Sequence, residues 1–324
     1  MSDSLSQMPR VVQACDGKID EQTVLDRYRL VGGPDEMVPR LRRVVAACEA
    51  NPAIAAEARR EMFALFDGSP PVNIERWTTV PERELGEDVG AFNMMIALAS
   101  APIIAETHRR FGLPPGHLAC TFSWFRPMID LYRRRHNGVS GITHTRTFWF
   151  RKHADGQLFR FGTMEFLRGP VPDFVPASFR ATLEPGDEVP TFHYPGGLGG
   201  LDPASIKASF VEATAFWKRA FGRYPRAWAC DSWLFNPVWR ELIPNSRIAH
   251  AIDLFEELPP LPYNPDEPSG LFFVYDRERC DPRDYPVTNS LERAFVTLYE
   301  RGDLPVDGCA LLRCDHDGRL LFRG

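Results

Sequence analysis

The apolar residues of this chain change their period once, near Asn137 and Gly138, and the change divides the sequence into two kinds of fold. Between Glu21 and His136 they recur at the i, i+3, i+4 spacing of helices. After residue 138, short runs rich in aromatic residues alternate with glycine, proline and helical segments, as in a sheet with connecting helices. The sequence predicts an α+β chain with two domains, a helical one at 1–140 and a mixed α/β one at 141–324.

The second domain reads as strands and helices in a defined order. The expected strands are 145–151, 158–168, 189–194, 226–231, 270–275 and 309–313. Asp155 and Gly156 predict a hairpin between the first two. Helices are expected at 203–220, at 237–242 and after Asn289, which begins a capping box.

A glycine-rich turn, GGLGG at 196–200, joins a predicted strand to the helix at 203–220. Glycines let backbone N–H groups approach an anion, and a following helix adds unpaired donors and a positive dipole end. The turn has no lysine before Lys207, which excludes a Walker loop, and Asp202 stands where a dinucleotide fingerprint needs its third glycine. A phosphate cradle and a plain surface turn both remain open from this segment alone.

Composition excludes several classes of function. A net charge of −5 argues against a general nucleic-acid binder. The N-terminus has no apolar signal region, and the uncharged run that follows Asp88 and ends at Ala105 is interrupted by Asn93 and Pro102, so we expect no membrane segment. Seven cysteines without a CxxC pair indicate a reducing, cytoplasmic location and no structural metal.

The run CDSWLFNPVWRELIPNSRI, from Cys230 to Ile248, resembles the C-x-S-W-L-L-x-P-x-L…L-P-x-x-S-x-I signature of GNAT-like acyltransferase C-terminal domains. In that family the signature follows a histidine-containing turn similar to HYPGG at 193–197, and a helical acyltransferase domain precedes it. The resemblance covers essentially the whole chain. It extends to the long-chain N-acyltransferases of teicoplanin-type and A40926-type glycopeptide antibiotic biosynthesis, which move a fatty acyl group from coenzyme A to the amine of a glucosamine.

The resemblance implies acyl-CoA as the donor, a glycopeptide or amino sugar as the acceptor, and no metal. We expect a monomer or a weak homodimer. Because Asp202 at the helix N-cap engages the first N–H groups, the pyrophosphate is expected over the glycines of the turn. The expected coenzyme contacts are Phe192, Tyr194, Gly196, Gly197, Leu198, Gly199, Gly200, Cys230 and Trp233.

Amide formation from a thioester needs a neutral amine, an oxyanion site and a proton for the thiolate. His193 is the expected general base, since imidazole titrates near neutral pH. Ser232 is a candidate proton donor to the thiolate, Asp231 could bind a sugar hydroxyl or orient His193, and Glu165 could orient the amine or act as an alternative base.

Each role has a structural alternative. His193 could simply anchor the turn, Ser232 could cap a helix and Cys230 could be a small buried apolar residue. For Glu165 the favoured alternative is a side chain facing solvent.

The main prediction is therefore an acyl-CoA-dependent N-acyltransferase acting by direct attack. Two alternatives stay open: an acyltransferase for another small amine or hydroxyl, and a non-catalytic acyl-CoA-binding module.

Overall fold

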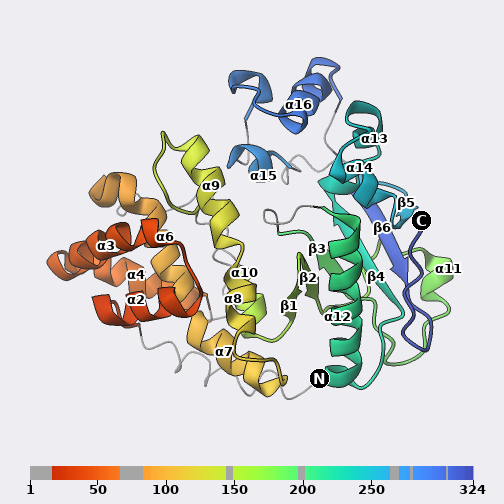
Figure 1. Ribbon diagram of the computed structural model, residues 1–324, viewed down its shortest axis with the longest axis horizontal. Coiled ribbons are helices and arrows are strands. Elements are labelled where there is room, and N and C mark those ends of the chain that lie inside the picture. Colours follow the sequence, from red (N-terminus) through yellow and green to blue (C-terminus); the bar gives the residue numbers. More distant parts are fainter. Residues whose placement is uncertain are drawn as a thin grey trace. The chain divides into compact units, whose positions relative to one another are not determined.

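The computed structural model describes residues 17–65, 83–143, 149–195, 201–262, 270–277, 280–303 and 306–323 (Figure 1). The chain divides into two compact units between Leu158 and Phe159. The sequence suggested a division between residues 140 and 141. The segment in between belongs to the first unit because its helix, α10 (Trp149–Ala154), packs on α7 (Ala101–Arg110), where the Thr107 hydroxyl donates to the Ala154 carbonyl at 2.7 Å.

The described part of the first unit is helical, as predicted. Its α-helices besides α7 and α10 are α2 (Glu21–Leu30), α3 (Val38–Ala50), α4 (Pro52–Ala64), α6 (Val89–Leu98), α8 (His117–Phe122) and α9 (Phe125–Arg135), with 3-10 turns at η2 (Asp35–Met37) and η3 (Gly86–Asp88). A single apolar core runs through all of the α-helices.

The helix α6 is buried on all sides, so its residues are apolar around the whole circumference. The stretch Arg83–Arg110, which contains α6 and α7, is long and apolar enough to cross a membrane by length and composition. However, 78% of its most apolar 18-residue window is buried inside the protein, which is the pattern of core helices.

The second unit is built on a six-stranded mixed sheet of order β1-β2-β3-β4-β6-β5. The strands are β1 (Leu158–Phe161), β2 (Met164–Leu167), β3 (Thr191–His193), β4 (Ala227–Ser232), β5 (Glu256–Leu258) and β6 (Gly308–Arg313). Within the described residues β3 and β4 pair in parallel, whereas β2 with β3, β4 with β6 and β5 with β6 are antiparallel. The remaining elements are α11 (Ala177–Arg180), α12 (Pro203–Phe221), η5 (Trp233–Phe235), α13 (Val238–Leu242), α14 (Arg247–Ile252), α15 (Leu271–Tyr275), η6 (Pro282–Asp284) and α16 (Ser290–Glu300).

The long helix α12 covers one face of this sheet and lies along its central strands (Figure 1). Phe166 of β2 and Phe192 of β3 pack edge-on against Phe210 of α12, each at 5.0 Å between ring centroids. Ala229 of β4 and Leu311 of β6 belong to the apolar cluster on the opposite face. Alternate residues of each strand therefore belong to two separate environments.

Local signals predicted several elements correctly. The helix expected at 203–220, the strands near 189–194, 226–231 and 309–313, and the capping box at Asn289 are all present within a few residues. The backbone N–H of Glu292 donates to the Asn289 side chain at 2.9 Å.

Three expectations were wrong. Trp149–Arg151 is not a strand but the start of α10, because Phe150 stacks between Phe122 and Trp124 in the helical core. The turn at Gly156 follows α10, and the sheet's first tight turn lies at Gly162, which splits the predicted strand 158–168 in two. The segment 271–275 is helical, and a strand at 256–258 was missed.

Candidate active site

The parallel strands β3 and β4 are held together at one end of their length. In the described chain their register is fixed by one pair, Thr191 opposite Ala229, and the Ala229 N–H donates to the Pro190 carbonyl at 3.0 Å. Beyond this pair lie His193 on β3 and Asp231 on β4. The ends of these two strands therefore carry several of the predicted site residues, on two different faces of the sheet.

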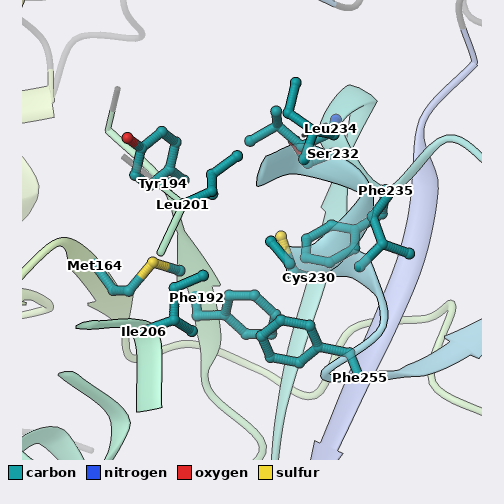
Figure 2. A pocket seen from close by; sticks show the side chains of 13 residues that line it. Met164, Phe192, Tyr194, Leu201, Ile206, Cys230, Ser232, Leu234, Phe235 and Phe255 are labelled. Atoms are coloured by element: carbon teal, nitrogen blue, oxygen red, sulfur yellow. Dashed lines mark hydrogen bonds between the residues drawn. The ribbon is translucent and has the colours of Figure 1, made fainter. Parts of the chain in front are cut away.

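A cavity opens between the ends of β3 and β4 and the helices α12 and α14. Figure 2 shows the stacked rings of Phe192 and Phe255 on one side, with Tyr194, Leu201 and Leu234 away from them. Its lining is Met164, Phe192, Tyr194, Leu201, Ile206, Cys230, Ser232, Leu234, Phe235, Ile248, Ala251, Ile252 and Phe255. Nearly all of these side chains are apolar, so the cavity suits an alkyl or pantetheine group rather than a charged one.

The cavity is small, about 20 Å³, which is room for about one water molecule. A pantetheine arm or acyl chain can enter only if side chains at its rim move. Leu201, which is partly exposed and directly precedes the N-cap of α12, stands at that rim (Figure 2).

His193 ends β3 and is partly buried. Its Nε2 lies 3.0 Å from the Thr191 hydroxyl, two residues earlier on the same strand. On the adjacent strand its antiparallel partner is Glu165. The imidazole is thus on the sheet face opposite to Phe192, which points toward α12.

Glu165 does not face solvent, contrary to the favoured expectation: it is 0% exposed. Its Oε1 lies 3.9 Å from Nη1 of Arg160, which is 3% exposed and whose Nε donates to the Gly162 carbonyl at 3.4 Å. Strand alternation misled the expectation because the second face of this sheet is also covered.

The end of β4 separates the four residues that the sequence singled out there. Cys230 and Ser232 line the cavity, Asp231 is exposed on the other face, and Trp233 is buried against Trp239 and Phe295. Ser232 also caps η5, since the Leu234 N–H donates to its hydroxyl at 3.3 Å. Trp233 is not among the residues that line the cavity.

Burial sets the protonation of two cavity residues. Desolvation raises the pKa of the Cys230 thiol well above its ordinary value, and the nearby Asp231, Cys309 and Asp307 add to the rise. Desolvation also raises the pKa of Tyr194, and this rise exceeds the lowering caused by the positive charges of Arg160 and Arg247. Both groups are neutral at pH 7, so Cys230 does not supply a thiolate nucleophile.

The helix α12 begins as predicted. Asp202 is its N-cap, and its carboxylate accepts from the Ser205 N–H and hydroxyl, both at 2.9 Å. These hydrogen bonds, led by the backbone N–H, lower the pKa of Asp202. The predicted phosphate cradle, Gly196, Gly197, Leu198, Gly199 and Gly200, lies outside the described residues.

Sequence reasoning missed the side of the cavity formed by α14. Its residues Ile248, Ala251 and Ile252 follow Ser246, whose hydroxyl accepts from the Ala249 N–H at 3.1 Å. Ser246 is the serine near the end of the acyltransferase signature that runs from Cys230 to Ile248. A capping serine followed by apolar residues was therefore the sequence signal from which this helix could have been predicted. Within the described part of the chain, no group of three or more His, Cys, Asp or Glu side chains could hold a metal ion.

Comparison with protein families divides the chain at the same place as its structure. Residues 22–156 match the N-acyltransferase N-terminal domain, and residues 158–311 match the GNAT-like C-terminal domain. A search of curated proteins finds no match.

Solved acyltransferase structures share the fold over most of both chains. One, a mutant in complex with octanoyl-CoA, has a TM-score of 0.67 at 21% identity and covers 90% of this chain and 88% of its own. Another, in complex with decanoyl-CoA and teicoplanin, has a TM-score of 0.66 at 21% identity, with 90% and 87% covered. A third, with CoA and 10C-teicoplanin, has the same TM-score, identity and coverage.

Proposed function

Because the chain belongs to the GNAT-like acyltransferases with a helical N-terminal domain, we propose that it transfers an acyl group from acyl-CoA to the amine of an amino sugar on a glycopeptide. The observation that carries the proposal is the position of His193, at the end of a parallel strand pair whose α12-facing side lines an apolar cavity. The imidazole lies on the other face of the same strand ends, directly before the glycine turn and α12. The fold is shared with acyltransferases bound to acyl-CoA and teicoplanin, which supports this donor and acceptor.

The proposed reaction is a direct attack. The neutral amine adds to the thioester carbonyl while His193 accepts a proton from the amine. Backbone N–H groups between Phe192 and Gly196 would stabilise the oxyanion. The C–S bond then breaks, and the departing thiolate takes a proton through the Ser232 hydroxyl at the cavity wall, which regains one from water.

The coenzyme would enter along the α12 side of the sheet. The cavity residues Phe192, Tyr194 and Cys230 would contact the pantetheine arm, with the glycines 196–200 around the pyrophosphate. Asp231, exposed on the opposite face, is positioned for a sugar hydroxyl. The raised pKa of Cys230 favours direct attack over an acyl-enzyme.

The test is thiol release from decanoyl-CoA by the pure chain with a panel of amines. Release that depends on teicoplanin-type amino sugars supports the proposal. Thiol release with small amines alone would argue against a glycopeptide acceptor. Binding of acyl-CoA without turnover would indicate a non-catalytic acyl-CoA-binding module.

The base role is tested by His193→Ala. We expect turnover to fall about 10²- to 10⁴-fold while the affinity for acyl-CoA stays within a few-fold. Equal losses in turnover and affinity would remove His193 from that role.

A further inference from the structure

Two buried charged side chains of the sheet unit, Arg160 and Glu165, lie next to the proposed base. On β1, Phe159 and Phe161 point toward Phe216 of α12, so Arg160 between them points to the other face. On β2, Phe166 points toward α12, so Glu165 shares the face of Arg160. His193 belongs to the same face because it is the direct cross-strand partner of Glu165.

Direct partners on antiparallel strands hold their Cβ atoms about 5 Å apart, within reach of a carboxylate and an imidazole. The Glu165 side chain cannot turn to water, because it is 0% exposed. Arg160 keeps a permanent positive charge 3.9 Å away, which favours the ionised carboxyl. A buried carboxylate needs donors, and the imidazole ring on the next strand can supply one.

We propose that Glu165 positions His193, by accepting a hydrogen bond from Nδ1–H and leaving Nε2 as the nitrogen that takes the proton of the amine. The proposal rests on the proposed function only for the identity of that amine. The Thr191 hydroxyl, 3.0 Å from Nε2, can rotate away when the amine takes its place. The carboxylate then stabilises the imidazolium that forms during attack.

A second carboxylate stands on the other side of the imidazole. The pairing of Thr191 with Ala229 brings Asp231 level with His193 on β4, on the same face. Asp231 is exposed, so water screens its charge, whereas Glu165 is fully buried. Further charged or titratable groups near this site include Tyr194 directly after β3, Arg247 on α14 and Asp307, which directly precedes β6. The structure therefore assigns the positioning role to Glu165 and not to Asp231.

The decisive measurement is the titration of His193 in the whole chain labelled with ¹³C,¹⁵N-histidine, with its signal assigned by its loss in His193→Gln. Glu165→Gln should lower the pKa of His193 by about one unit or more, and Asp231→Asn by clearly less. Glu292→Gln is the matched control: Glu292 is also buried, at 3% exposed, and accepts from Thr288 at the start of α16. An unchanged pKa in Glu165→Gln, or an equal fall in Asp231→Asn, overturns the proposal.

A measurement on the unmodified chain covers the case in which Glu165→Gln does not fold. The ¹⁵N shifts of neutral His193 should show the proton on Nδ1, and a proton on Nε2 overturns the proposal.

Kinetics give a further readout in the folded variants. Glu165→Gln should lower kcat about ten- to hundredfold with an unchanged KM for acyl-CoA, and Glu165→Asp should recover part of the loss. A rise in KM with kcat unchanged would contradict the positioning role. The NMR results do not depend on turnover, so full activity of His193→Ala would refute the proposed base while leaving the Glu165 contact separately testable.

Discussion

The two units bury titratable side chains in different ways. In the helical unit His108 and His153 are 3% and 0% exposed, and His117 contacts His108 edge-on at 5.0 Å. No opposite charge appears among the influences on His108: burial comes first, and the two other histidines act in the same direction, lowering its pKa to about 3. In the sheet unit, Arg160 and Glu165 are buried as a pair of opposite charges.

The difference separates groups that serve folding from groups that serve chemistry. A neutral buried imidazole with a pKa near 3 cannot take a proton from a substrate at pH 7. A neighbouring cation favours the charged form of a buried carboxyl, and a carboxylate so placed can tune an adjacent imidazole. His108 is therefore a core residue, and our proposal places the reactive group in the sheet unit.

The largest expected effect comes from breaking the buried pair. Arg160→Met should cost about 3–5 kcal/mol of unfolding free energy, because it leaves a buried carboxylate without its cation. The matched variant in the helical unit is Arg60→Met: Arg60 pairs with the buried Glu61 but is 48% exposed itself, so the loss should be at most about 1 kcal/mol. Hydrogen exchange followed separately in each unit measures the loss of unfolding free energy in both variants. Equal losses in Arg160→Met and Arg60→Met would contradict the expected difference between a fully buried and a half-exposed ion pair.

The next largest expected effect is a pH dependence of the stability of the helical unit, caused by His108. The unfolded chain titrates this histidine near 6.5 and the folded chain near 3, so between these values the unfolded state alone binds the proton. Stability of the helical unit should fall as pH falls below 6.5, by about 2 kcal/mol at pH 5. After correction for intrinsic exchange rates, the amides of the helical unit should exchange faster at pH 5 than at pH 7. His108→Phe should make this difference between the two pH values smaller.

The exposed His250 provides the control for that experiment, because His250→Phe removes a histidine of the sheet unit without touching the buried cluster. An unaltered pH dependence in His108→Phe would show that other groups dominate acid unfolding.

Much of the framework that carries the site could be predicted because its signals are local. Asp202 followed by Pro203 marks the start of α12, and the buried residues Ile206, Phe210, Ala213 and Trp217 recur along it at helical spacing. The strand β4 was likewise placed within one residue. Capping and periodicity act within one element, so they can be recognised in the sequence without knowing which elements pack against it.

What could not be predicted depends on contacts far apart in sequence. Phe150 lies in a helix because Phe122 and Trp124 surround it, although its own segment has strand composition. The short edge strand β5 owes its place to β6, where Arg313 binds Glu256 through two hydrogen bonds of 2.8 and 3.0 Å. Glu165 seemed solvent-facing because no local pattern reveals that both sheet faces are covered.

A smaller effect is expected at the two aspartate caps, one in each unit. Asp202 caps α12 through Ser205, and Asp20 caps α2 through Thr23, with the same pattern of one backbone and one hydroxyl donor. If the pyrophosphate lies near the start of α12, Asp202→Asn removes a repulsive charge and should tighten acyl-CoA binding about two- to fivefold. Asp20→Asn should leave binding unchanged, and calorimetry that finds the two variants alike would place the phosphate elsewhere.

The smallest effect, an absence of change, is expected for the buried cysteines. Burial raises the pKa of Cys48 in the helical unit to about 11 and raises that of Cys230 well above its ordinary value, so neither thiol forms a thiolate at pH 7. Iodoacetamide should label the partly exposed Cys120 and Cys280 well before either of them. Cys230→Ala should keep turnover within a few-fold, because direct attack needs only its volume at the cavity wall. An acyl adduct on Cys230 in mass spectra of the chain mixed with acyl-CoA would contradict this expectation. It would mean that the sheet unit activates the buried Cys230 thiol, whereas the Cys48 thiol of the helical unit, which is also buried, stays unreactive.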